Sequence, residues 1–138
     1  MTLNEELIRS RCQEIAESLV RLERIGEKTK EVFLNDCDAQ DIASYRLLVA
    51  IEAALNLCYH IAAKRLKKVP EDYAECFAIL SEAGIIPMEL SERLQKMARF
   101  RNLLIHMYWK IDYSTVYDII KHDTKDLRRF SELIAGLL

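Results

Sequence analysis

The stretch RNLLIHMYW, residues 101–109, places several side chains with acid–base or charge chemistry inside an otherwise apolar segment. Arg101 carries a permanent charge on a planar fork that can bind two phosphate oxygens at once. His106 is of the residue type that gains and loses a proton near neutral pH, which suits general acid–base catalysis. Asn102 and Tyr108 add an amide and a phenol. The stretch therefore predicts either proton transfer at a phosphate or an ordinary core helix with polar edges.

The spacing of these residues on a helix leaves that choice open. Asn102 and His106 lie four residues apart, so they share a face and the amide is expected to orient the imidazole. Arg101 and Tyr108 lie seven apart and share a second face. Arg101 and His106 diverge by about 140° around a straight helix. They can meet only if the helix ends or bends near His106, or if a second copy of the chain completes the site.

Polar residues at helix edges are common, so spacing alone favours the structural interpretation. A resemblance reverses that preference. RNLLIHMY resembles the R-x4-H-x-Y signature of HepT-like toxins, a branch of the HEPN-domain ribonucleases. Other segments resemble the same family in the same order, and the likeness is weakest in the first 35 residues. These segments are AIEAALNLCYHIA (50–62), PEDYAECFAILSEAGIIP (70–87) and LQKMARFRNLLIHMYWKID (94–112).

The resemblance implies an all-α, up-and-down HEPN bundle that forms a homodimer, with two copies of the motif facing one cleft. It implies a toxin that cuts RNA, and a cognate minimal nucleotidyltransferase antitoxin, MntA-like, that attaches AMP to Tyr108. Two positions depart from the family. Arg99 occupies a position that is often small, and the apolar Met107 separates His106 from Tyr108.

The expected chemistry is metal-independent endoribonucleolytic cleavage without a cofactor. His106 would act as general acid or base and Arg101 would bind the phosphate. Asn102 would orient His106 or hydrogen-bond to the substrate, and Arg99 would contact the substrate. The expected products are a 2′,3′-cyclic phosphate and a 5′-hydroxyl.

Two alternatives remain open. The first is a HEPN module that binds a nucleotide or substrate for a partner nucleotidyltransferase without cutting RNA. The pair Arg101 and His106 counts against it, because a pure binder does not need an acid–base histidine. The second is a helical scaffold with no chemistry at all.

A second polar feature is a stripe of residues at i,i+4 spacing in the most apolar segment: Glu52, Asn56 and His60. The stripe either forms a wall of the cleft and positions the arginine, or makes ordinary hydrogen bonds across the bundle. The cationic run 64–68 is expected to be solvated. Arg93, Lys96 and Arg99 are expected to steer RNA locally. Other rings are expected in the core rather than as base-stacking platforms: Tyr45, Tyr59, Tyr73, Phe77 and Trp109. His122 is expected to be structural.

Composition limits the class of protein. The chain has 138 residues, 51% of them hydrophobic and 30% charged, which predicts one globular domain over 1–138. A net charge of −2 excludes a global basic field for nucleic acid. The four cysteines form no metal-ligand pattern, and no signal peptide is evident, so we expect reduced thiols in the cytoplasm. Polar residues interrupt the apolar segment 47–63, which favours a buried helix over a membrane span.

The three glycines and two prolines favour a few long helices. We expect helices over 3–25, 38–67, 71–83 and 88–107, and a last one from Ser114 to about Leu137 that breaks near His122–Asp123. Thr2 and Glu5 would cap the first helix, and a polar connection would span 27–37 and lead to a second helix start at Asp38. The expected helix openers are Pro70 and Pro87, and the expected stops are Gly26 and Gly84. The prediction is an all-α bundle of four or five helices.

Overall fold

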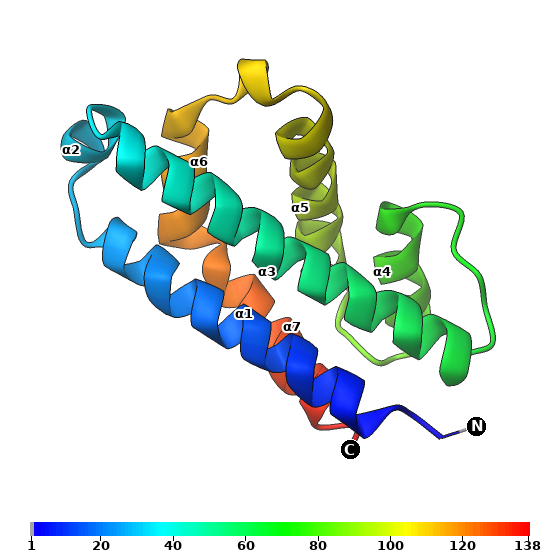
Figure 1. Cartoon of the computed structure of the whole chain (residues 1–138). Coiled ribbons are helices and arrows are strands. Elements are labelled where there is room, and N and C mark those ends of the chain that lie inside the picture. Colours follow the sequence, from blue (N-terminus) through cyan, green and yellow to red (C-terminus); the bar gives the residue numbers. More distant parts are fainter. Residues whose placement is uncertain (1) are drawn as a thin grey trace.

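The computed structural model describes residues 2–138, and helices account for all the regular structure in that range (Figure 1). It contains seven α-helices and one 3₁₀ turn, with no strand among residues 2–138. The helices are α1 (Glu5–Gly26), α2 (Lys30–Leu34), α3 (Cys37–Lys64), α4 (Tyr73–Glu82), α5 (Met88–His106), α6 (Tyr113–His122) and α7 (Thr124–Ala135), and the 3₁₀ turn η1 is Tyr108–Lys110. The all-α prediction is confirmed. The helix count is higher because α2 was not predicted and the last helix is two separate helices.

Several helices begin at a different cap from the one predicted. The α1 cap is Asn4, whose side chain accepts a hydrogen bond from the Leu7 backbone at 3.0 Å, so the predicted role of Thr2 is wrong. The α4 cap is Asp72, and Pro70 lies before the helix. Short carboxylates and amides reach the free backbone N–H groups of a first turn, and this explains why they displace the predicted residues.

The two glycine stops have different physical roles. Gly84 has φ +78°, the left-handed conformation that glycine adopts without strain, and it ends the segment after α4 as predicted. Gly26 is the last residue of α1 and does not terminate it by a left-handed turn. A Cβ at Gly26 would lie 3.2 Å from Ile120 Cγ2, so this glycine allows α1 to approach α6 closely.

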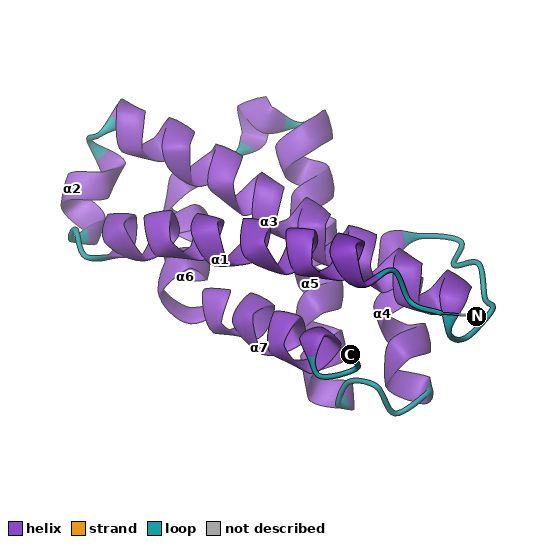
Figure 2. Cartoon of the chain, turned by 60° about the horizontal axis from the view of Figure 1, so that its bottom comes forward, coloured by secondary structure: helices purple, strands orange, loops and turns teal. Residues whose placement is uncertain are grey.

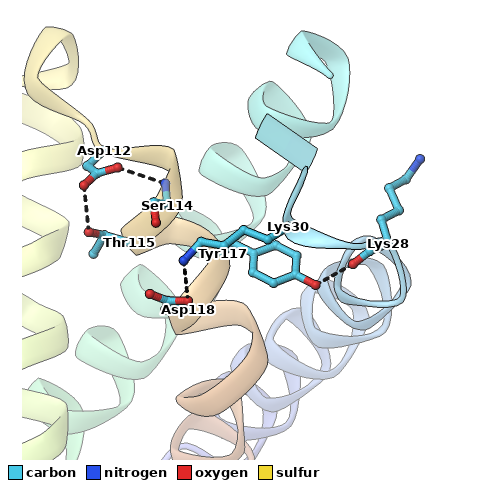
Figure 3. A network of polar contacts seen from close by, with 7 residues as sticks. All are labelled: Lys28, Lys30, Asp112, Ser114, Thr115, Tyr117 and Asp118. Carbon is cyan, nitrogen blue, oxygen red and sulfur yellow. Dashed lines mark hydrogen bonds and ion pairs between the residues drawn. The ribbon is translucent and has the colours of Figure 1, made fainter. Parts of the chain in front are cut away.

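The connection 27–37 is more ordered than predicted, because it contains α2. Phe33 anchors α2 in the core with no exposed surface. The Tyr117 hydroxyl on α6 donates a hydrogen bond to the Lys28 carbonyl, and Lys30 pairs with Asp118 at 3.0 Å (Figure 3). These contacts fix the connection against α6.

The start of α6 also differs from the prediction. Asp112 is the cap, and its carboxylate accepts a hydrogen bond from the Ser114 backbone at 2.9 Å (Figure 3). Ser114 therefore lies inside the first turn instead of capping it. The predicted break near His122 is confirmed, since α6 ends there and α7 starts at Thr124.

The long helix α3 crosses the bundle and contacts α1, α4, α5, α6 and α7 (Figure 1). By length and apolarity α3 would suffice to span a membrane, but 56% of its most apolar window is buried inside the molecule. That burial is typical of a core helix. On the other side of α1 lies α7, so α1 is packed between α3 and α7 (Figure 2).

Helices α4 and α5 form an antiparallel pair joined by the short turn around Gly84 (Figure 1). The pair is held to α7 by Phe77, whose ring meets Phe130 edge-to-face at 5.5 Å. Because the two helices run in opposite directions, the first turn of α4 lies beside the last turns of α5. The segment 101–106 therefore faces the residues around Tyr73.

Candidate active site

A hollow of about 630 Å³ lies between the last turns of α5 and the start of α4. Four predicted site residues line it together: Arg99, Arg101, Asn102 and His106. Its other wall comes from the segment around the α4 cap and from one residue of α3. The residues of that wall are Tyr59, Glu71, Asp72, Tyr73 and Ala74, with Ala98 from α5 at the base.

Helix α5 ends within the motif, at His106. His106 is the last residue of α5, and Met107 leaves the helical conformation with φ −138° and ψ 43°. The Arg101 side chain reaches Tyr73, the first residue of α4, while His106 is exposed at the end of α5. Both side chains therefore line one hollow, although five residues separate them on the helix.

The Arg101 guanidinium is fixed on several sides. Its Nε donates to the Glu52 carboxylate of α3, and its Nη1 donates to Asn102 Oδ1 at 3.1 Å. Its Cζ lies 4.6 Å from the centre of the Tyr73 ring. Only 13% of the side chain is exposed. Such a cation is held in place by charge, hydrogen bonding and cation–π stacking together.

Asn102 contacts Arg101 in this structure and makes no hydrogen bond to His106 among residues 2–138. The Asn102 Oδ1 acceptor is engaged by the arginine, and its NH₂ group makes no side-chain hydrogen bond within residues 2–138. His106 itself is exposed and has no protein hydrogen-bond partner within the described chain. Its imidazole is accessible to a molecule that enters the hollow.

The three residues of the polar stripe on α3 contact different parts of the molecule. Glu52 reaches Arg101, whereas Asn56 accepts a hydrogen bond from Arg11 Nε at 2.9 Å. His60 Nε2 accepts one from the Asn4 backbone at 3.0 Å. The stripe divides because four residues advance about 40° beyond one full turn, so successive members rotate from α5 towards α1. Only Glu52 contacts a residue of the site.

Tyr108 lies outside the helix that carries the motif. It belongs to η1 and is 68% exposed, and its ring meets the 67% exposed Trp109 edge-to-face at 5.5 Å. Because α5 ends at His106, the seven-residue helical spacing does not place Tyr108 on one face with Arg101, and that expectation is wrong. Tyr108 does not line the hollow, but its phenol is exposed two residues after His106.

The aromatic residues expected in the core fall into three groups. Phe77 is buried as predicted. Tyr45 and Trp109 are 60% and 67% exposed, so their assignment to the core is wrong. Tyr59 and Tyr73 are half-buried, 5.7 Å apart and edge-to-face, and both line the hollow. Burial raises the pKa of Tyr59 to about 12, so this phenol stays protonated at neutral pH.

The acidic wall was not predicted from the sequence. Asp72 caps α4 by accepting from the Glu75 backbone at 2.7 Å, and the Glu71 backbone donates to Glu75 Oε2 at 2.8 Å. The sequence did contain a signal for it, namely the short turn between the helices expected over 71–83 and 88–107. A tight antiparallel connection brings the start of the first helix beside the end of the second, so residues near 71 could have been expected beside the motif.

Among the cations expected to precede the motif, only Arg99 lines the hollow. Arg93 and Lys96 line a separate hollow of about 360 Å³ with Met97 and Phe100. There Arg93 lies 3.7 Å from Asp126, which is 5% exposed. Burial raises the pKa of that carboxyl, against the lowering effect of the nearby Arg93 charge.

Possible metal ligands do not gather in the described part of the chain. Residues 2–138 contain no cluster of three or more His, Cys, Asp or Glu side chains placed to hold an ion. Cys58 and Cys76 are buried free thiols, Cys12 is half-buried and Cys37 is exposed. The polar groups that line the hollow are two guanidinium groups, an imidazole, an amide, two phenols and two carboxylates.

Comparison with known proteins identifies the same architecture. Over 102 residues the chain is 26% identical to the mRNA nuclease HepT of Shewanella oneidensis, covering 74% of this chain and 77% of that protein. The tri-AMPylated Shewanella oneidensis HEPN toxin, solved in complex with MNT antitoxin, superposes with a TM-score of 0.86 at 23% identity, covering 94% of this chain and 97% of that chain.

A cytosolic protein of unknown function from Bacillus subtilis superposes with a TM-score of 0.78 at 18% identity, covering 94% of this chain and 90% of that chain. These structures show the fold. The sequence model of the family described as ribonuclease HepT-like matches residues 15–134, which is most of the chain. The chain belongs to the HepT-like ribonuclease family, with the fold of a HEPN toxin.

Proposed function

We propose that this protein is the toxin of a toxin–antitoxin pair and a metal-independent endoribonuclease. The observation that carries the proposal is the hollow in which Arg101, Asn102 and His106 meet with Arg99. The names of the related proteins support it: one is an mRNA nuclease, and another is a HEPN toxin in complex with an antitoxin. We place the protein in the cytoplasm, as its free cysteines and a cytosolic structural neighbour favour.

The reaction is attack of a ribose 2′-hydroxyl on the adjacent phosphate. The bond between O2′ and phosphorus forms, and the bond between phosphorus and O5′ breaks. A base removes the 2′ proton, a cation stabilises charge on the phosphate, and an acid protonates O5′. His106 supplies proton transfer, which contributes about 10²–10⁴-fold. Arg101 supplies the cation through its planar fork, and Asn102 and Arg99 contact the substrate.

A homodimer supplies the second acid or base. The reaction needs one group to accept a proton and another to donate one, and within residues 2–138 His106 is the one histidine that lines the hollow. We assign the second role to the His106 of a second copy in preference to the carboxylates of Glu71 and Asp72, because Asp72 is engaged as the α4 cap. Exposed apolar side chains surround the same end of α5, namely Ile105, Tyr108 and Trp109. A second copy that covers them would bring its own His106 to the site.

A cognate nucleotidyltransferase antitoxin neutralises the toxin by attaching AMP to Tyr108. The 68% exposure of Tyr108 supports this assignment, because a transferase must reach the phenol oxygen. The added phosphate would bring negative charge next to the motif and compete with RNA for its cations. The Shewanella structure supports a modified state, since that toxin is tri-AMPylated and bound to an MNT antitoxin.

The decisive experiment incubates RNA with pure protein in excess EDTA. Cleavage that ends in a 2′,3′-cyclic phosphate and a 5′-hydroxyl is expected, and His106→Ala should abolish it. A protein that cuts RNA only after Mg²⁺ is added would contradict metal independence. Cleavage that persists in His106→Ala would contradict the assignment of the general acid or base.

The second candidate is a HEPN module that binds a nucleotide for a partner nucleotidyltransferase without cutting RNA. The observation that favours it is that Arg99 and Arg101 offer two cations to a phosphate group while a single histidine lines the hollow among residues 2–138, which suits nucleotide binding as well as cleavage. Titration with ATP and AMP beside the cleavage assay separates the candidates. Nucleotide binding without cleavage would select the binding module. A scaffold with no chemistry predicts that His106→Ala changes neither toxicity nor partner binding.

A further inference from the structure

We infer that Glu52 and Tyr73 are positioning residues that hold Arg101 with its outer nitrogen edge turned towards the hollow. The catalytic role of Arg101 in this inference rests on the proposed function. The contacts that hold Arg101 are observed independently of it. Three helices meet at the guanidinium: α3 contributes Glu52, α4 contributes Tyr73, and α5 contributes Arg101 itself.

The burial of Arg101 shows that these contacts are needed. Its side chain is 13% exposed, whereas that of Glu52 is 43% exposed. Taking a guanidinium out of water is unfavourable unless a counter-charge and hydrogen bonds replace its hydration. Glu52 provides the counter-charge from the rim, where water still solvates the carboxylate. The pair therefore sets the position of a cation that would otherwise extend into solvent.

The pattern of used and unused donors gives the orientation. A guanidinium has five N–H groups, one on Nε and two on each Nη. Glu52 accepts from Nε, and Asn102 accepts one hydrogen from Nη1. The remaining donors lie on Nη1 and Nη2, the two nitrogens that together bind a pair of phosphate oxygens. Within residues 2–138 both hydrogens on Nη2 and one on Nη1 make no hydrogen bond, so Arg101 retains donors on both Nη nitrogens for a ligand.

The Tyr73 ring packs against the Arg101 guanidinium. The Arg101 Cζ lies 4.6 Å from the centre of the Tyr73 ring, so the guanidinium lies over the ring. Tyr73 is itself held, because Tyr59 meets it at 86° and a 5.7 Å separation, and because it is the first residue of α4. Movement of the guanidinium away from this position would lose both the ring contact and the Glu52 contact. Prearranged donors of this kind stabilise a transition state without reorganising.

Glu52→Gln tests the inference with little change of shape. Removing the carboxylate charge makes the hollow more positive, so KM for RNA should stay the same or fall. The turnover number kcat should drop about 10- to 100-fold, as expected when a catalytic group is misplaced by up to an ångström. A loss of kcat without a rise in KM is a change that a merely structural role does not produce.

Tyr73 is tested by two substitutions. Tyr73→Phe keeps the ring face and should lose much less kcat than Tyr73→Leu, which removes the cation–π contact. The matched control is Asn56→Ala, one turn further along α3, which removes a hydrogen bond to Arg11 and leaves the hollow intact. The inference is overturned if Glu52→Gln and Asn56→Ala have equal kcat, or if Tyr73→Phe and Tyr73→Leu are equally impaired.

A second measurement does not depend on catalysis. The Nε–Hε resonance of Arg101, identified by its loss in Arg101→Lys, should exchange slowly with water in the wild-type protein and in Asn56→Ala. It should exchange at least tenfold faster in Glu52→Gln. If Tyr73→Leu does not fold, Glu52→Gln alone decides. Slow exchange in a protein that cuts no RNA would refute the proposed function and keep the positioning role. Equal exchange in wild type and Glu52→Gln would refute the positioning role.

Discussion

At the scale of single residues, two histidines have the same local setting and different neighbours. His106 ends α5 and His122 ends α6, and both are exposed. Only His106 lines the hollow that contains Arg101. The difference between them is therefore their position in the molecule, and His122 provides a matched control for the chemistry of His106.

His106→Ala should abolish RNA cleavage and toxicity, whereas His122→Ala should keep both. Each exposed substitution should change the free energy of unfolding by less than about 0.5 kcal/mol. Arg101→Ala should also abolish activity, because no other residue of the hollow presents a bidentate fork on the Tyr73 ring. Cleavage assays and thermal unfolding of the same preparations check this. A His106→Ala protein that loses activity only because it unfolds would indicate that the motif stabilises the fold and has no catalytic role.

Tyr108→Phe should leave RNA cleavage largely intact and make the protein resistant to the proposed antitoxin, because phenylalanine lacks the oxygen that would accept AMP. Tyr45→Phe is the control, since Tyr45 is 60% exposed on α3 and outside the hollow. Intact mass spectrometry after incubation with the partner nucleotidyltransferase and ATP gives the number of AMP groups. Equal modification of wild type and Tyr108→Phe would place the acceptor elsewhere.

At the scale of secondary-structure elements, the start of α1 is attached to α3 through a titratable contact. His60 Nε2 accepts a hydrogen bond from the Asn4 backbone, which requires an unprotonated Nε2. Burial, and then the charge of Lys64, lowers the pKa of His60 below its ordinary value of 6.5. Around and just below pH 6.5 the folded state therefore binds fewer protons than the unfolded state. In that pH range the free energy of unfolding rises as the pH rises.

Acidification from pH 7 through 6.5 and below should therefore destabilise the protein and loosen the first turn of α1. His60→Gln should flatten this pH dependence, because glutamine does not titrate and its amide oxygen can still accept from Asn4. Denaturant titrations of both proteins between pH 5 and 7.5 measure the effect. A wild-type stability that increases as the pH falls through 6.5 would contradict the assignment.

The turn between α4 and α5 sets the register of the two walls of the hollow. Gly84 has φ +78°, and a Cβ added there would have no neighbouring atom within 4 Å, so a substitution meets backbone strain without a clash. Gly84→Ala should lower the free energy of unfolding by about 1 kcal/mol, the cost of a left-handed conformation. Gly84→Asn should lose less, because asparagine tolerates this region better. Equal stability of all three proteins in urea titrations would contradict this account.

At the scale of the whole molecule, features that depend on local sequence patterns were predicted better than features that depend on long-range contacts. The helical class, the stop at Gly84 and the break near His122 follow from periodicity and from glycine or capping residues, which act over a few positions. The caps at Asn4 and Asp112 were missed because a neighbouring serine or threonine fits the same statistical pattern. The short helix α2 depends on the burial of Phe33, which local sequence does not show.

The candidate site divides in the same way. Arg101, Asn102 and His106 lie in one short segment, so their types and spacing could be recognised from the sequence. Glu52 and Tyr73 come from other helices, and their contacts with Arg101 depend on the register of α3 and α4 against α5. Without knowledge of that register, the sequence predicts only a polar stripe that contains Glu52 and a core tyrosine at Tyr73. It does not show that both side chains contact Arg101.

The last prediction concerns assembly, because the hollow of one copy holds one exposed histidine for a reaction with two proton transfers. Trp109, 67% exposed beside the motif, is expected at the interface of a homodimer. Trp109→Asp should yield monomers and lower cleavage at least tenfold, because a charge buried at an interface is unfavourable. Val69→Asp, at a 90% exposed position between α3 and α4, should remain dimeric and active. Sedimentation equilibrium at micromolar concentrations distinguishes these states, and a wild-type monomer with full activity would refute the composite site.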